Sequence, residues 1–163
     1  MSKRVEKLLK DYPQMVQERN CLAYQIAHFK GLSTEEVIES MYTPRQDGER
    51  VQTSILSDKT AQIAMNYRER TERINREWYA HLANELYILE GKLQLLEAAI
   101  NALSGVLPDL MRDMVVDQMT WEQLAEKYHM SRATVGRQRQ KAIQEMEALY
   151  EENEKKVIAY MLD

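Results

Sequence analysis

The sequence contains few of the residues that interrupt helices or cross-link chains. Its 163 residues include only 5 Gly and 3 Pro, and a chain with so few breaks is suited to long helices. Cys21 is the only cysteine, which excludes a disulfide within one chain and a zinc site built from several cysteines. No stretch approaches the ~18 consecutive apolar residues of a membrane-spanning helix. These absences predict an all-α protein with no membrane partner, and we expect a cytoplasmic location.

The residue patterns of common enzyme and metal sites are also absent. His28, His81 and His129 are far apart in the sequence, and none forms a His pair or a Cys–His pair at metal-binding spacing. There is no Gly-rich phosphate loop, and the acidic residues near the C-terminus form no group with a nucleophile. We therefore expect no metal, no cofactor and no enzymatic activity.

Charge is distributed unevenly along a chain whose formal net charge is -4. From Ser131 to Lys141 the sequence has no acidic residue, and its charged residues are Arg132, Arg137, Arg139 and Lys141. Acidic residues follow soon afterwards: Glu145, Glu147, Glu151, Glu152 and Glu154. A local basic surface of this kind is compatible with nucleic-acid binding even in an acidic protein.

Residues 1–42 are predicted to form an N-terminal helical segment. Apolar residues alternate three and four apart, with Arg19 in the one gap, which is the pattern of a helix that packs along a seam; they are Val5, Leu8, Tyr12, Met15, Leu22, Ile26 and Phe29. Pro13 either kinks this helix or starts it afresh. Gly31 is a plausible stop, and Ser33 with Glu36 forms the capping-box pattern of a second, short helix.

Residues 43–57 have the composition of a linker, and residues 58–104 that of a long coiled-coil-like helix. In the latter, apolar residues alternate three and four apart; they are Leu86, Leu89, Leu93, Leu96, Ile100 and Leu103. Such a helix cannot bury its apolar stripe alone. We expect it to pack against the N-terminal helix as an intrachain hairpin and also against a second subunit. The aromatic residues at helical spacing, such as Trp78 and Tyr79, are expected to serve in packing.

Residues 105–150 are predicted to form a C-terminal helix-turn-helix domain, followed by an acidic tail at 151–163. Thr120 is placed to cap a first helix with Gln123 in the capping-box position, and Ser131 to cap a second after a short turn. Small Ala125 allows the two helices to approach closely. This arrangement frees one face at the start of the second helix for the major groove of double-stranded DNA.

The candidate DNA contacts carry basic, amide and hydroxyl groups, which bind phosphates and base edges. They are Thr120, Ser131, Arg132, Ala133, Thr134, Arg137, Gln138, Arg139 and Lys141. Arg132 and Arg137 are candidates for guanine and Gln138 for adenine, whereas Arg139 and Lys141 are candidate phosphate contacts. Gly136 is expected on the same exposed face. The plainer alternative is that this basic run is only a solvated helix surface.

The same residues carry a resemblance to region 4 of bacterial sigma factors. The positions that match are Leu124, Ala125, Ser131, Arg132, Val135, Lys141 and Ala142. The chain departs from that pattern at Gln138, where the family has an apolar residue. More of the chain resembles phage-encoded transcription regulators of the ArpU and RinA type, to which the segment Thr53–Ala64 is also similar. This resemblance implies control of phage or prophage genes in a bacterial host, with RNA polymerase as a possible partner.

Three functions therefore remain open. A dimeric, sequence-specific transcription regulator is preferred, because one helix-turn-helix buries little surface and gains specificity from paired half-sites. The second is a sigma-like factor acting with core RNA polymerase, for which Trp78 and Tyr79 with Arg73 and Arg76 are the nearest match to a promoter-melting cluster. The third is a phage DNA-packaging protein of the terminase small-subunit type.

Overall fold

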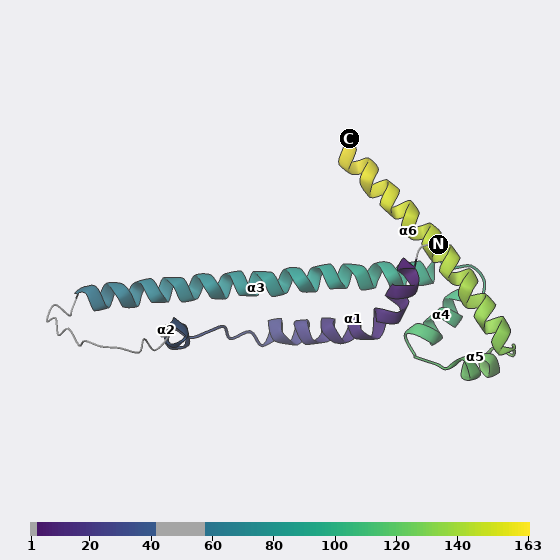
Figure 1. The fold of residues 1–163 in the computed structure, drawn as a ribbon, viewed down its shortest axis with the longest axis horizontal. Coiled ribbons are helices and arrows are strands. Elements are labelled where there is room, and N and C mark those ends of the chain that lie inside the picture. The colour runs from purple at the N-terminus through teal and green to yellow at the C-terminus, as the bar shows by residue number, and fades with distance from the viewer. Residues whose placement is uncertain (1–2, 42–57) are drawn as a thin grey trace, which may run out of the picture. The chain divides into compact units, whose positions relative to one another are not determined.

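A computed structural model describes residues 3–41 and 58–163 (Figure 1). These residues form α-helices and no strand, so the predicted all-α fold class is confirmed. The helices are α1 (Arg4–Ala27), α2 (Thr34–Met41), α3 (Asp58–Asn101), α4 (Leu107–Val115), α5 (Trp121–Lys127) and α6 (Arg132–Leu162). The predicted linker at 43–57 lies outside the described residues. Within the described ranges, no helix combines the length and the apolar character that crossing a bilayer requires.

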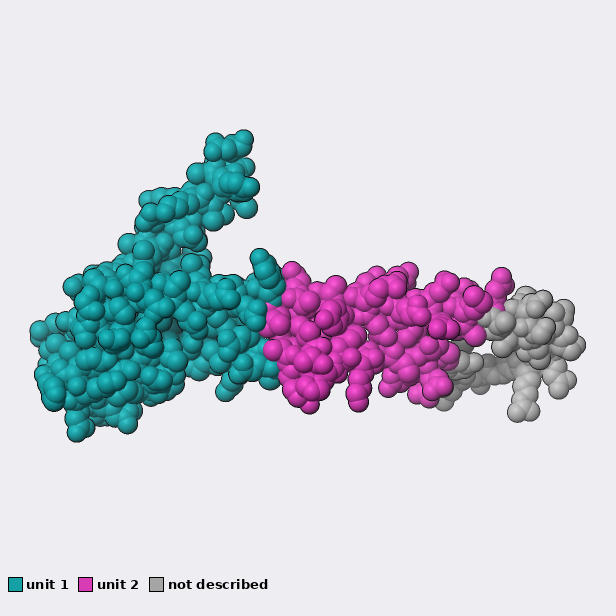
Figure 2. All heavy atoms as spheres, turned by 180° about the vertical axis from the view of Figure 1, so that it is seen from behind, with its two compact units in different colours: residues 1–21, 87–163 teal, residues 22–86 magenta. Residues whose placement is uncertain are grey.

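The chain divides into two compact units that do not follow the segments predicted from the sequence. Unit 1 comprises residues 1–21 and 87–163, and unit 2 comprises residues 22–86 (Figure 2). The predicted boundary at 104–105 therefore lies inside unit 1. The predicted helix-turn-helix domain shares its unit with the N-terminus of the chain and with the end of α3.

Unit 1 has one apolar core to which both ends of the chain contribute. From α1 come Val5, Leu9, Tyr12 and Met15, from α3 come Leu93, Leu96, Ala99 and Ile100, and Leu103 follows just after α3. The later helices add Leu107, Leu110, Met111, Leu124, Val135, Ala142, Ile143 and Met146. The seams predicted in α1 and α3 thus meet in this core, since a helix with an apolar stripe is stable only when that stripe is covered.

Polar contacts in unit 1 join segments that are distant in sequence. Glu147 of α6 accepts a hydrogen bond from the backbone N–H of Val5 at 3.0 Å. Glu145 accepts from both the N–H and the hydroxyl of Ser104, at 3.1 and 2.7 Å. These bonds satisfy backbone donors at the start of α1 and after α3, which an isolated helix end would leave unpaired. Glu145 and Glu147, the first two acids of α6, therefore bond α6 to the segment after α3 and to the start of α1.

Helix α6 runs to Leu162, so the residues predicted as a separate acidic tail continue the same helix. Residues 151–163 are exposed throughout. The i to i+4 ion pair between Lys156 and Glu152, at 2.9 Å, contributes a few tenths of a kcal/mol to such a helix. No Gly or Pro occurs between Arg137 and Leu162 to end the helix earlier.

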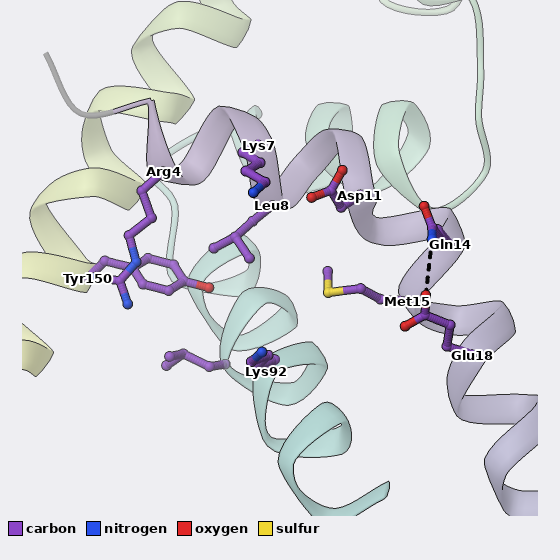
Figure 3. Close-up of a pocket in the computed structure, with 10 residues that line it drawn as sticks. Arg4, Lys7, Leu8, Asp11, Gln14, Met15, Glu18, Lys92 and Tyr150 are labelled. Carbon is purple, nitrogen blue, oxygen red and sulfur yellow. Dashed lines mark hydrogen bonds between the residues drawn. The ribbon is translucent and has the colours of Figure 1, made fainter. Parts of the chain in front are cut away.

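The hydroxyl of Tyr150 on α6 is buried without a hydrogen-bond partner among the described residues. Figure 3 shows Tyr150 beside Arg4, whose guanidinium carbon lies 5.4 Å from the centroid of the tyrosine ring. The Tyr150 side chain is thus anchored by its ring and by apolar burial, and its polar atom contributes nothing. An unpaired buried polar group costs about 1–3 kcal/mol.

Replacing Tyr150 by Phe is expected to raise the free energy of unfolding by about 1 kcal/mol, because the ring stays and the unpaired hydroxyl is removed. Chemical denaturation of the two proteins would measure the difference. A Tyr150→Phe protein less stable than the wild type would contradict this interpretation of the hydroxyl.

In unit 2 the predicted capping box is present. The N–H of Ser33 donates to Glu36 Oε2 at 2.8 Å, and the N–H of Glu36 donates to Ser33 Oγ at 3.2 Å. Gly31 precedes it with a φ of 69°, and a Cβ at Gly31 would lie 2.7 Å from the side chain of Asn75. Asn75 in turn bonds both the N–H and the carbonyl of Leu32, at 2.8 and 2.9 Å. The capping box and the side-chain amide of Asn75 thus determine the path of the chain between α1 and α2.

The expectation that the aromatic residues of unit 2 serve in packing is only partly met. Phe29 packs edge-on against Tyr79, with ring centroids 5.3 Å apart. However, 54% of Trp78 and 44% of Tyr79 remain exposed. Helical spacing predicted a shared face for these rings, but it could not show how much of that face a neighbouring element covers.

Candidate nucleic-acid interface

Helix α5 begins where the capping pattern predicts. Thr120 Oγ1 accepts from the N–H of Gln123 at 3.3 Å, and Gln123 Oε1 accepts from the N–H of Thr120 at 2.9 Å. This reciprocal pair satisfies two backbone donors and is worth about 1 kcal/mol. Leu124, one turn further, is fully buried in the core of unit 1. The cap and this anchor together fix the direction of α5.

The turn between α5 and α6 is short and closed by hydrogen bonds. The N–H of Met130 donates to the carbonyl of Ala125 at 3.0 Å, and His129 adopts a φ of 52°. Ser131 then caps α6, with its Oγ accepting from the N–H of Thr134 at 3.1 Å. This arrangement is the helix, tight turn and second helix that the sequence predicts at these residues.

Gly136 lies at a close approach of the two helices and is half-buried, which corrects the expectation that it is exposed. A Cβ on Gly136 would lie 3.3 Å from the ring of Trp121 at the start of α5. The absence of a side chain on α6 therefore makes room for an aromatic ring on α5. Glycine normally weakens a helix interior. At position 136 the lack of a side chain allows α6 to pack closely on the Trp121 ring.

Exposure divides the predicted contact residues into two groups. Those that are exposed are Thr120, Ser131, Arg132, Ala133, Arg137 and Lys141. Those that are half-buried are Thr134, Gln138 and Arg139. Val135, Ala142 and Ile143 are buried on one side of α6, and Ala133, Arg137 and Lys141, which follow one another at intervals of four residues, lie on its outer side. We call this surface the α6 face.

Two arginines near the α6 face form ion pairs. Arg132 Nη1 lies 3.3 Å from Glu122 Oε1 on α5, and Arg139 Nη1 lies 3.4 Å from Glu6 Oε1 on α1. The Arg139 side chain is only 26% exposed. Its predicted contact with a DNA phosphate would therefore compete with the Glu6 carboxylate, which the sequence did not indicate. In contrast, Arg137 and Lys141 have no ion-pair partner within the described ranges.

The acids of α6 lie beyond the α6 face. No acidic residue occurs between Glu126 and Glu145. Hydrogen bonds from the side chain and backbone of Ser104 lower the pKa of Glu145 and keep it ionised toward the α3–α4 turn. The charge of Lys141 is the least of the causes that lower the pKa of Glu145. The net positive character of residues 131–141 is thus preserved at the surface.

A buried ion pair positions α5 against α4. Asp113 of α4 accepts from Lys127 Nζ at 2.6 Å and from Tyr128 Oη at 2.5 Å. Burial raises the pKa of Asp113, but hydrogen bonds from Lys127 and Tyr128 outweigh burial and lower it. For Tyr128, burial and then the bond to Asp113 raise the pKa. No local sequence pattern predicts this group, because Lys127 and Tyr128 follow Asp113 by fourteen and fifteen positions.

Two hollows lie within unit 1. The first, of about 490 Å³, has both signs of charge at its wall, from Lys7, Asp11 and Glu18 of α1 and Lys92 of α3 (Figure 3). The second, of about 740 Å³, is lined by Lys3, by residues of α1 and α4, by Trp121 at the start of α5 and by Arg139 of α6. The second hollow therefore borders the start of α5 and the side of α6 that carries Arg139. Among the described residues there is no group of three acidic, His or Cys side chains that could hold a metal ion.

Comparisons with known proteins identify no family for this chain. No protein-family model matches it, and neither a curated protein nor a solved structure shows significant similarity.

Proposed function

We propose that the chain is a double-stranded DNA-binding transcription regulator that inserts the start of α6 into the major groove. The observation that carries the proposal is the α6 face, where Arg137 and Lys141 are exposed and form no ion pair with another described residue, on a helix whose first acid is Glu145. Arginine and lysine reach guanine edges and phosphates, and a capped helix after a tight turn is the element that enters the groove.

Specific groups of the α6 face are assigned by their exposure. Arg137 is the principal base-reading residue, because its guanidinium is exposed and can bind a guanine through two hydrogen bonds. Lys141, one turn later, is a phosphate contact. Ser131 and Thr120 place hydroxyl groups at the two helix starts. Gln138 is half-buried, and we assign it a secondary role at the edge of the groove.

Selection of bound sequences from a random pool of duplex DNA tests the proposal directly. An enriched motif would support specific binding, and two half-sites about one helical turn apart would support a homodimer. The proposal assigns the chain to gene regulation in a phage or prophage, in line with its resemblance to ArpU- and RinA-type regulators. Absence of any enriched motif would overturn sequence-specific recognition.

Replacing Arg137 by Ala is expected to weaken binding to the selected motif by about tenfold to a hundredfold and to relax the preference at one base pair. Titration of labelled duplex at fixed salt would measure the change. Arg68→Ala is the matched control, since Arg68 is an exposed arginine in unit 2 that belongs to neither candidate binding surface. Equal effects of the two substitutions would show that only general charge is involved.

A second candidate function is a sigma-like factor that acts with RNA polymerase core. The exposure of Trp78 and Tyr79, beside exposed Arg73 and Arg76 on α3, favours it. Aromatic and basic side chains on one helix suit the binding of unpaired bases. Transcription by core polymerase with this chain and no other sigma factor would support this candidate, and its absence would leave the regulator.

A further inference from the structure

A basic hollow lies in unit 1 beside the start of α5 and the side of α6 that carries Arg139. Its wall includes Lys3, Glu6, Lys7, Lys10, Trp121 and Arg139. Lys7 and Lys10 lie on α1 and Lys3 directly precedes it. Their spacings of four and three residues place them on one side of the helix over about 10 Å. All three are exposed. We refer to this surface as the basic hollow.

The charges of the basic hollow are incompletely balanced. Glu6 is the one acid at its wall, and it pairs with Arg139 at 3.4 Å. In the described parts of the chain, the lysines at positions 3, 7 and 10 have no carboxylate within ion-pair distance. Four cationic groups thus share one acid at this wall, although Lys7 also lines the first hollow beside Asp11. A polyanion at this surface would gain attraction from each lysine.

The basic hollow meets the helix-turn-helix through two residues. Arg139 belongs to the basic stretch of α6 and also lines the hollow. Trp121 lines the hollow, packs under Gly136 of α6 and directly follows Thr120, an exposed candidate contact at the start of α5. A duplex that lies on the α6 face and reaches Thr120 would therefore bring its sugar–phosphate backbone toward α1. Half to two-thirds of protein contacts to DNA go to this backbone, and lysine is suited to them.

We propose that the basic hollow binds the phosphate backbone of the same DNA duplex that α6 reads, with Lys3, Lys7 and Lys10 as the contacts. This inference rests on the proposed DNA binding and extends it to the opposite end of the chain. Glu6 opposes the binding, because its carboxylate repels phosphates and holds the Arg139 guanidinium. The N-terminal helix thus provides affinity without sequence preference.

The first test replaces Lys3, Lys7 and Lys10 together by Gln in the full chain. Affinity for a short duplex of mixed sequence is measured at several salt concentrations by fluorescence anisotropy. The triple variant is expected to bind about tenfold or more weakly, and the slope of log affinity against log salt should fall by about 2–3, at roughly 0.9 per lost contact. The motif preferred by the wild type should remain unchanged.

The matched control removes the same number of charges elsewhere, through Lys30→Gln, Lys92→Gln and Lys155→Gln. These lysines are exposed and lie outside the basic hollow. If the control triple weakens binding and lowers the salt slope as much as the test triple, the hollow is not a contact surface and the inference is overturned.

The second test, Glu6→Gln, has the opposite expected sign. Removing the carboxylate should strengthen binding to the mixed-sequence duplex about threefold, since one repulsive charge is lost and Arg139 is released. A purely structural ion pair would instead give unchanged or weaker binding, and that result would contradict the role of Glu6. Thermal unfolding of the same variant separates a loss of stability from a change in affinity.

The outcomes distinguish this inference from the proposed function. If the wild-type chain binds no duplex DNA, both fail together. If the wild type binds DNA and Arg137→Ala alters its preferred motif while the lysine triple changes nothing, the proposed function stands and the basic hollow is excluded.

Discussion

Replacing Leu124 by Ala is expected to lower the free energy of unfolding of unit 1 by about 3–5 kcal/mol, the largest single effect we foresee. Leu124 is fully buried and is the one residue of α5 that enters the core completely. Its truncation removes apolar contacts and leaves a cavity that a seven-residue helix capped at both ends cannot easily close. DNA binding should be lost with the fold of α5 and α6.

Tryptophan fluorescence can follow this unfolding in unit 1 alone. The chain has two tryptophans, and Trp78 belongs to unit 2 while Trp121 belongs to unit 1. In a Trp78→Phe background, Trp121 is the remaining reporter. Leu162→Ala serves as the control, because Leu162 is 82% exposed and its truncation should change stability by less than about 0.5 kcal/mol. Equal midpoints for the two leucine variants would refute the assigned burial.

Replacing Asp113 by Asn is expected to cost about 2–3 kcal/mol at neutral pH. The carboxylate accepts from Lys127 and Tyr128, and its side chain is only 12% exposed. The neutral amide keeps the size of the side chain but loses the charge that Lys127 requires. The side chain of Lys127 is 52% exposed, which keeps the loss below the roughly 3–5 kcal/mol of a fully buried pair.

The same group predicts how stability depends on pH. Burial raises the pKa of Asp113, but the hydrogen bonds from Lys127 and Tyr128 lower it by a larger amount. The folded-state pKa of Asp113 therefore lies below its unfolded value. The stabilisation is therefore complete above the unfolded pKa of about 4. It is lost as the pH falls through the folded-state pKa. The unfolding curves of wild type and Asp113→Asn should converge in acid.

Asp109→Asn is the matched control for this experiment. Asp109 lies on the same helix, α4, and pairs with Arg112 at 3.4 Å, but its side chain is 71% exposed. An exposed pair of this kind contributes less than about 1 kcal/mol. If Asp113→Asn and Asp109→Asn have equal effects from neutral pH to acid, the Asp113 group does not have the proposed stabilising role.

Features set by neighbouring residues were predictable from the sequence. The capping pairs Ser33–Glu36 and Thr120–Gln123 are both present, because each pair joins residues of a single helical turn. The alternating apolar residues of α1 and α3 likewise identified the side of each helix that enters the core of unit 1. Local chemistry and helical periodicity were sufficient for these elements.

Features that join distant residues were not predictable. The pair of Arg139 and Glu6 spans 133 positions, and no local pattern connects the basic stretch of α6 with the start of α1. Gly136 was expected on an exposed face, whereas its place against Trp121 depends on how steeply α5 and α6 cross. The candidate contact residues could thus be identified, but their competitors and neighbours required the tertiary structure.

Unit 1 is assembled from the first 21 residues and the last 77, and this has a consequence for synthesis on the ribosome. Val5, Leu9 and Met15 are synthesised well before the residues of α6 that share their core. The apolar face of α1 therefore lacks part of its final cover until α6 has been synthesised. Shortening the polypeptide from its amino end would remove part of the same core that supports the helix-turn-helix.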